Sequence, residues 1–328
     1  MKTLVLGGTG IIGNHILREL LNRGHEVFAL SRGLTPALNL KGLAVKTIKA
    51  DINDLAALTE AFQGMDWVFH AAAYYPKNAF GIDKHVANAL AQTRTVITAA
   101  RSSGIKRLVY TSSLTTIGHS KTDKIADETC AYDLFECDPH PYFKLKYLIE
   151  EEFRAAVAKD GFPVVMVNPT GIFGPYELKP VELCLVPQLA RGKIPGYVLR
   201  PINVVDAADV AMGHVLAAEK GRIGERYILG GHNIDTKILM SQICEVLGVK
   251  APKLKLPMGV ALAVAYANEA LSLVLGTAPR VPVLGLKFAE YGQALSSDKA
   301  IRELGYAIHP MSPCFERALK WYREIGYC

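Results

Sequence analysis

The sequence has no clustered cysteines. Its six cysteines lie far apart and include no Cys-x-x-Cys pair; they are Cys130, Cys137, Cys184, Cys244, Cys314 and Cys328. This spacing argues against a metal cluster and a disulfide framework, so we expect reduced thiols, no bound metal and a cytoplasmic location. The first residues lead directly into an apolar run, and we therefore expect no signal peptide.

Blocks of one charge are also absent. The net charge is +6, and the basic residues are scattered along the chain. This distribution gives no support to nucleic-acid binding. Half of the 328 residues are hydrophobic, which is enough for the core of one large domain or two smaller ones.

No long apolar run is free of polar residues. The most apolar stretch, residues 258–276, contains Asn268 and Glu269. These residues argue against a membrane-spanning helix. We expect a helix that packs on the protein or lines an apolar pocket, with contact to a membrane surface as the alternative.

A glycine-rich turn follows the first apolar run, Thr3-Leu4-Val5-Leu6. Gly7, Gly10 and Gly13 have the spacing Gly-x-x-Gly-x-x-Gly, and a helical pattern begins at Ile11. A strand, a glycine turn and a helix in this order are typical of a dinucleotide site. The turn lets a pyrophosphate approach the backbone, and the helix N-terminus offers unpaired N–H groups. We therefore assign Gly7, Thr9, Gly10, Ile11, Ile12 and Gly13 to cofactor binding.

Strands and helices alternate through the first 170 residues. Expected strands at 26–30, 45–49, 67–69, 107–110 and 163–167 are separated by helical patterns. This alternation predicts an α/β Rossmann fold, with a doubly wound parallel sheet. We expect residues 1–170 to form the cofactor domain, with 203–248 returning to it. Residues 171–202 and 249–328 should form a substrate-binding cap.

Arg32 stands where the second strand is expected to end. An acid there would bond the ribose hydroxyls of NAD, whereas an arginine can pair with a 2′-phosphate. This favours NADP, with NAD still open, although the residue could instead be a solvent-facing loop arginine. The alanines Ala71, Ala72 and Ala73, after the fourth strand, would let a cofactor lie close to the backbone. His70 before them could equally be a packed histidine, and we give it no catalytic role.

Tyr142 and Lys146 lie four residues apart and so share one face of the expected helix at 141–158. A nearby cation lowers the pKa of a phenol from its usual value of about 10, which suits a general acid–base. Ser113, after the fifth strand, could donate a second hydrogen bond to a reacting carbonyl oxygen. Ser112 is the alternative, since neighbours on a strand face opposite ways.

With these motifs in order, the chain resembles an extended short-chain dehydrogenase/reductase. Within that family it is most similar to the bacterial dihydroflavonol 4-reductase-like branch, which includes hopanoid-associated sugar epimerase-like proteins. The resemblance rests on the glycine turn, Asp51-x-x-Asp54, Val109-Tyr110-Thr111-Ser112-Ser113, Tyr142-x-x-x-Lys146, Asn168-Pro169, Asp298-Lys299-Ala300 and Glu303-Leu304-Gly305-Tyr306. It covers nearly the whole chain.

The resemblance implies further cofactor contacts. Lys146 would also bond the nicotinamide ribose, Asp51 and Ile52 would lie by the adenine, and Pro169 and Thr170 would approach the nicotinamide. It also implies a homodimer through the helices near 83–103 and 141–158. Asp206 stands where relatives usually have a histidine, which leaves the docking of the cap open.

Three functions remain, in this order of preference. The first is an NADP-dependent oxidoreductase acting on a carbonyl or hydroxyl of a largely apolar small molecule, since the expected cap is apolar. The second is a sugar-nucleotide epimerase or dehydratase with bound NAD, for which Lys179, Arg191, Lys193 and Arg200 are available cations but form no obvious clamp. The third, a redox-sensing NADP-binding protein, would have no need of Ser113, Tyr142 and Lys146.

Overall fold

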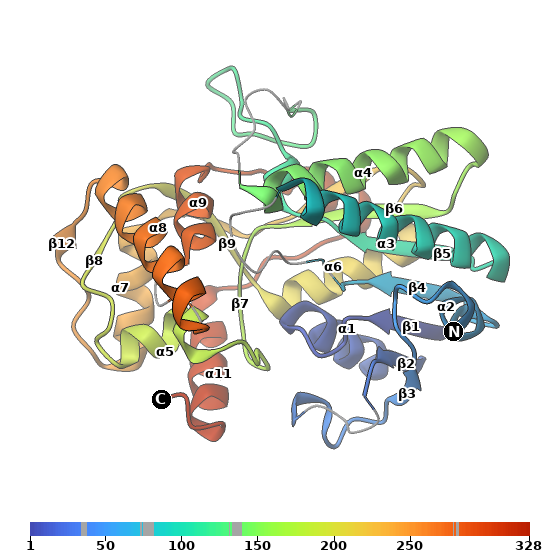
Figure 1. Ribbon diagram of the computed structural model, residues 1–328, viewed down its shortest axis with the longest axis horizontal. Helices are drawn as coiled ribbons and strands as arrows, with labels where there is room; N and C mark the ends of the chain where they lie inside the picture. Colours follow the sequence, from blue (N-terminus) through green and yellow to red (C-terminus); the bar gives the residue numbers. More distant parts are fainter. Residues whose placement is uncertain are drawn as a thin grey trace.

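Seven parallel strands form the central sheet of the computed structural model, in the order β10-β6-β5-β4-β1-β2-β3 (Figure 1). The structure describes residues 1–33, 38–72, 74, 82–130, 132, 140–277, 279 and 282–328. The strands are β1 (Lys2–Leu6), β2 (Glu26–Ser31), β3 (Lys46–Lys49), β4 (Trp67–His70), β5 (Arg107–Thr111), β6 (Val164–Pro169) and β10 (Arg226–Leu229). This arrangement confirms the predicted doubly wound α/β fold.

Helices cover both faces of this sheet. The helices α1 (Ile11–Asn22), α6 (Ala207–Lys220) and α10 (Asp298–Leu304) pack on one face, and α2 (Leu55–Phe62), α3 (Ile82–Ser103) and α4 (Pro141–Asp160) pack on the other. An apolar core lies on each face of the sheet. Successive residues of β1 point into opposite cores: Val5 packs on the α1 side, and Leu4 and Leu6 pack on the other side. Both faces of each central strand are therefore buried, which explains the apolar runs in the sequence.

A smaller cap lies beside the sheet. Its apolar core joins α5 (Leu185–Ala190), α7 (Thr236–Leu247) and α11 (Met311–Glu324). Two small sheets belong to this side of the molecule: β7 (Gly171–Phe173), β9 (Pro201–Asp206) and β11 (His232–Asp235), and the pair β8 (Gly196–Tyr197) and β12 (Leu254–Lys255). The helices α8 (Met258–Leu275) and α9 (Val283–Glu290) lie against each other. Short 3₁₀ turns are η1 (Leu38–Leu40), η2 (Leu114–Thr116) and η3 (Val181–Leu183).

Two segments pack with other neighbours than those we predicted, while the domain boundaries stay a prediction. Within 203–248, β10 joins the central sheet and α6 packs on it, whereas β9 and β11 pair with each other and α7 packs in the cap. Conversely, Ala300, Leu304 and Tyr306, which we predicted in the cap, lie in the core beneath α6. The pairing of β9 with β11 was not predictable, because an apolar strand pattern does not specify which sheet the strand joins.

Candidate active site

The glycine turn connects β1 to α1. The N–H of Gly10 donates to the carbonyl oxygen of Gly7 at 3.0 Å, and Gly7 has a left-handed φ of +86°. A Cβ on Gly13 would lie 2.2 Å from that same oxygen, so the turn closes only around glycine there. Gly10 is different, because a Cβ on it would meet nothing closer than 3.4 Å. Its lack of a side chain leaves the space in front of α1 open and provides no cap for the first N–H groups. That combination fits a phosphate.

The neighbouring strand ends lie along the same edge of the sheet. The Ala71 N–H donates to the carbonyl oxygen of Leu6 at 3.0 Å and so extends the pairing of β4 with β1. The Ala72 backbone nitrogen lies where a Cβ on Gly7 would be. Arg32 follows β2 and is exposed. Asp51 follows β3, where its Oδ1 accepts from the Asn53 N–H at 2.8 Å. These positions are those predicted for a dinucleotide; Ala73 lies outside the described residues, and the cofactor roles remain predictions.

Tyr142 and Lys146 lie one turn apart on α4, which begins at Pro141 after an N-cap at His140. The Lys146 Nζ lies 5.9 Å from the centre of the Tyr142 ring and donates to the carbonyl oxygen of Thr111 at 2.8 Å. Lys146 is buried, and this burial lowers its pKa to about 7, while the nearby Glu150 carboxylate opposes the shift. Lys146 therefore changes charge near neutral pH, one helical turn from the Tyr142 ring.

Aromatic side chains surround the Tyr142 ring. Phe288 of α9 packs edge-on at 5.4 Å between ring centroids, and Phe143 of α4 makes a similar contact. Leu284, also on α9, belongs to the same cluster. A cap helix thus brings apolar groups to the predicted acid, and this apolar cover could not be read from the spacing of the motif.

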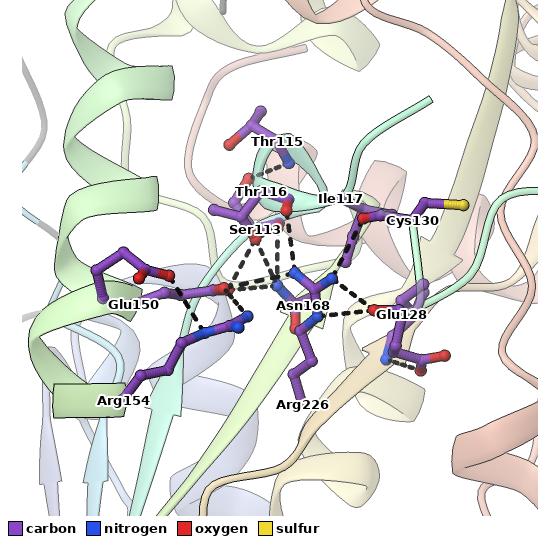
Figure 2. Close-up of polar contacts among 12 residues, drawn as sticks. Ser113, Thr115, Thr116, Ile117, Glu128, Cys130, Glu150, Arg154, Asn168 and Arg226 are labelled. Atoms are coloured by element: carbon purple, nitrogen blue, oxygen red, sulfur yellow. Dashed lines mark hydrogen bonds and ion pairs between the residues drawn. The ribbon is translucent and has the colours of Figure 1, made fainter. Parts of the chain in front are cut away.

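Ser113 is the N-cap of η2 and lies two residues after the end of β5. Its Oγ accepts from the Thr115 N–H at 3.2 Å, so its own proton can donate elsewhere. The Asn168 Nδ2 lies 3.0 Å from the Ser113 carbonyl oxygen, and Figure 2 shows this amide reaching into the turn that Ser113 begins. The N–H of the neighbouring Ser112 donates to the carbonyl oxygen of Val167 at 2.8 Å, so Ser112 is still hydrogen-bonded to β6.

Glu150 is the buried anion of this region (Figure 2). Its Oε1 accepts from Thr116 Oγ1 and from Asn168 Nδ2, both at 2.7 Å, and its Oε2 lies 3.7 Å from an Arg226 guanidinium nitrogen. Glu150 therefore joins α4, η2, β6 and β10 beneath Ser113. Sequence reasoning missed it, although its position four residues after Lys146 places it on the same helix face.

Four buried side-chain oxygens near the ends of β5 and β6 have no hydrogen-bond partner among the described residues. They are Ser112 Oγ, Thr115 Oγ1, Asn168 Oδ1 and Thr170 Oγ1. Buried polar groups are nearly always paired, so unpaired oxygens at the strand ends are consistent with a site that a bound molecule completes. Together with the glycine turn, they make the carboxyl edge of the sheet fit a dinucleotide.

Comparison with known proteins assigns the family. The model of the NAD-dependent epimerase/dehydratase family matches residues 3–230. The chain belongs to this family. The family uses NAD or NADP. Relatives of this chain are named as reductases and dehydrogenases, so the protein is an oxidoreductase of the extended short-chain dehydrogenase/reductase type.

Three relatives span almost the whole chain. A protein of Synechocystis sp. named for dihydroflavonol 4-reductase is 33% identical, covering 98% of this chain and 95% of its own. A 4-hydroxy-2-methyl-3-oxo-4-farnesyl-3,4-dihydroquinoline-1-oxide ketoreductase from Stigmatella aurantiaca is 32% identical, covering 94% and 92%. The solved structure of a nucleoside-diphosphate-sugar epimerase from Pseudomonas aeruginosa has a TM-score of 0.83 and 30% identity, covering 100% and 99%.

The cap contacts the cofactor domain through residues that sequence reasoning did not single out. Asn39 is buried, and its Nδ2 donates to the carbonyl oxygens of Thr9 at 2.9 Å and Tyr176 at 2.8 Å. Tyr176 has a left-handed φ of +69°, the Arg18 guanidinium lies 3.6 Å from its ring centre, and Trp321 of α11 packs edge-on against it. The glycine turn is thus tied to the cap, and no local pattern signals these contacts.

Asp206, at the position where relatives usually have a histidine, links the cap to α6. Its Oδ1 accepts from the Ala208 N–H at 2.9 Å and so caps α6, and its Oδ2 pairs with Arg317 of α11. The aspartate therefore joins α6 to the cap helix α11. His70 is buried, with its pKa lowered to about 3 by burial, as fits a packed histidine.

Proposed function

We propose that this protein is an NADP-dependent oxidoreductase that acts on a carbonyl or hydroxyl group of a largely apolar small molecule. The observation that carries the proposal is the buried Tyr142–Lys146 pair under the aromatic cover of α9. The pair supplies acid–base chemistry, and the cover supplies an apolar setting for the substrate. Ser113, at the end of β5, would complete the site.

The protein's own residues would handle the proton and the developing charge. The bound nicotinamide would supply or accept hydride. Tyr142 would donate its phenolic proton to the substrate oxygen during reduction and take it back during oxidation. Lys146, when protonated, would favour the phenolate. Ser113 would donate a hydrogen bond to the same oxygen, a contribution typically worth about 2.7–4 kcal/mol in the transition state.

The apolar substrate class rests on the groups near Tyr142. Phe288 and Leu284 come from α9, and neither offers a hydrogen bond. The names of two relatives point the same way, since one refers to a dihydroflavonol and the other to a farnesyl-substituted quinoline. We propose a ketone or secondary alcohol on a ring or chain of comparable polarity.

The choice of NADP rests on Arg32. Its guanidinium could pair bidentately with a 2′-phosphate, whereas it cannot accept bonds from ribose hydroxyls. Arg32 is exposed and follows β2, which pairs with β1, the strand that leads into the glycine turn. NAD remains the alternative. We also propose a homodimer with α3 and α4 as the interface, as the family resemblance implies, and a cytoplasmic location, as the scattered cysteines suggest.

A sugar-nucleotide epimerase is the second candidate, because the Pseudomonas aeruginosa relative is named as one. Such a substrate carries a diphosphate, which needs cations. Lys179 is paired with Glu177 at 2.8 Å, while Arg191, Lys193 and Arg200 are exposed. Paired and scattered cations support a diphosphate site less well than the aromatic cover supports an apolar substrate.

One experiment separates the two candidates. Nucleotide released from the purified, denatured protein is identified, and NADPH and NADH consumption is measured with a panel of cyclic and aryl ketones. Consumption of NADPH with a ketone supports the proposal. Tightly held NAD, no consumption of either cofactor and conversion of a uridine-diphosphate sugar would overturn it in favour of the epimerase.

A further inference from the structure

Helix α8 has the reverse of the polarity expected for a water-facing helix. Its buried positions are Ala261, Ala265, Glu269 and Ser272. Its exposed positions include Val264, Leu271 and Val274, with 56%, 55% and 83% of their surface accessible. Val260, Tyr266, Leu273 and Leu275 are exposed as well. The small and polar side chains face the protein, and the large apolar ones face outward, although soluble helices normally have the opposite arrangement.

The helix is held against the protein from one side. The Glu269 carboxylate accepts from the Val283 N–H, at the start of α9, at 3.3 Å, and α8 and α9 lie together (Figure 1). By length and composition α8 could cross a bilayer, and 22% of it is buried. A helix that keeps its one carboxylate turned toward α9 is suited to lie along a surface, with the opposite face available.

Cations precede this helix directly. Lys250, Lys253 and Lys255 are exposed, and none of them pairs with an acid in the part of the chain that the structure describes. The strand β12, which contains Lys255, pairs with β8, and the exposed Arg191 and Lys193 shortly precede β8 in the chain. Figure 1 shows β8, β12 and α8 at the same end of the molecule, away from the central sheet.

We propose that this end of the protein docks on the surface of an anionic phospholipid bilayer. The apolar residues of α8 would enter the boundary between headgroups and acyl chains, and the neighbouring lysines would attract the anionic headgroups. The pairing of an apolar face with unpaired cations is what favours a bilayer over a second copy of this chain, whose matching face would be equally cationic. Tyr266 suits the headgroup level, where aromatic rings with a polar tip gather.

The proposal does not depend on the reaction. It does, however, place the docked face one helix away from Tyr142, since α9 contacts both α8 and the Tyr142 ring. A substrate that dissolves in lipid would then be concentrated at the side of the molecule where the aromatic cover lies.

The test is vesicle co-sedimentation of the full-length protein. The vesicles are pure phosphatidylcholine, or 70:30 phosphatidylcholine and phosphatidylglycerol, at low and high salt. The first variant combines Val264→Ser, Leu271→Ser and Val274→Ser; the second combines Lys250→Gln, Lys253→Gln and Lys255→Gln. A matched control makes three exposed apolar residues polar elsewhere, Leu55→Ser, Ile223→Ser and Ile301→Ser.

We expect the unaltered protein to bind the anionic vesicles at least tenfold better than the neutral ones, and more weakly at high salt. Both test variants should lose at least tenfold in binding, and the control should not. Unchanged thermal unfolding would show that the variants fold. Failure of the unaltered protein to bind overturns the proposal, and so does equal binding by the α8 variant. A fall in molar mass of the α8 variant by light scattering, without vesicle binding, would instead identify an interface between copies.

Discussion

The Nζ atom of Lys146 lies 5.9 Å from the centre of the Tyr142 ring, one turn along the same helix. The lysine is buried against the Thr111 carbonyl, and burial lowers its pKa to about 7. Its charge therefore changes in the range where the enzyme would work. The proposed proton transfer relies on this neighbour, because a protonated Lys146 would favour the Tyr142 phenolate.

The glycine turn gives a prediction with its own control. Gly13→Ala places a Cβ 2.2 Å from the Gly7 carbonyl oxygen, so we expect a loss of about 3 kcal/mol in the free energy of unfolding. Gly10→Ala meets nothing closer than 3.4 Å and should fold normally. It should nevertheless weaken cofactor binding at least tenfold, because the methyl group occupies the phosphate approach. Urea unfolding and fluorescence titration with NADPH measure the two effects. Normal cofactor affinity in Gly10→Ala would contradict the placement of the pyrophosphate.

Arg32 tests the cofactor preference. Arg32→Ala should raise the Kd for NADPH at least tenfold and leave that for NADH within about twofold, since only NADPH carries the 2′-phosphate. Arg191→Ala, which removes an exposed arginine of the cap, serves as the control and should change neither value. Equal weakening of both cofactors by Arg32→Ala would mean that the residue does not read the phosphate.

Glu150 tests the support beneath Ser113. Glu150→Gln removes the charge that faces Arg226 and should cost about 3 kcal/mol of unfolding free energy. With η2 less firmly held, kcat should fall about tenfold while KM changes little. The adjacent Glu151 is exposed and pairs only with Arg154 in the described chain, so Glu151→Gln should stay within about 0.5 kcal/mol. A kcat equal in both variants would confine Glu150 to a structural role.

Acid should destabilise the protein through three buried histidines. Burial lowers the pKa to about 4 for His15 and His214 and to about 3 for His70. Between these values and 6.5 the unfolded chain binds more protons, so stability falls as pH falls through this window. Each histidine contributes a slope approaching about 1.4 kcal/mol per pH unit.

His214→Gln should remove one such slope, because glutamine can replace the bonds to Val210 and Thr111 without titrating. Urea unfolding at pH 7, 6 and 5 measures it, with the exposed His119→Gln as control. An unchanged slope in His214→Gln would show that this histidine is protonated in the folded state.

Features that depend on nearby residues were predictable from the sequence. Asp54 immediately precedes α2 and is a residue type favoured at the N-cap, and its Oδ1 accepts from the Ala57 N–H at 3.1 Å. The helix that carries Tyr142 begins at Pro141, as expected, because proline fits the first turn. In both cases the residue that indicates the helix start lies within one helical turn of the backbone groups that it affects.

Features that depend on distant partners were not predictable. The Asn39 amide joins Thr9 to Tyr176, which is 137 residues away. The strand around Asn203 joins β7 and β11, although its apolar pattern would fit the central sheet equally well. Composition predicted α8 as a helix packed on the protein, but it packs through its small residues and exposes the large ones. Composition gives the amount of apolar surface, and only the fold determines where that surface faces.

The most direct test of the account compares the unaltered protein with Tyr142→Phe, using NADPH and the best ketone found in the panel. Phenylalanine keeps the ring in its contacts with Phe288 and Phe143 and removes only the hydroxyl. We predict that NADPH binding stays within about twofold while kcat falls by about 10²–10⁴, the usual contribution of a positioned acid. A kcat within a few-fold of the unaltered protein, with NADPH still bound, would contradict the assignment of Tyr142 as the proton donor.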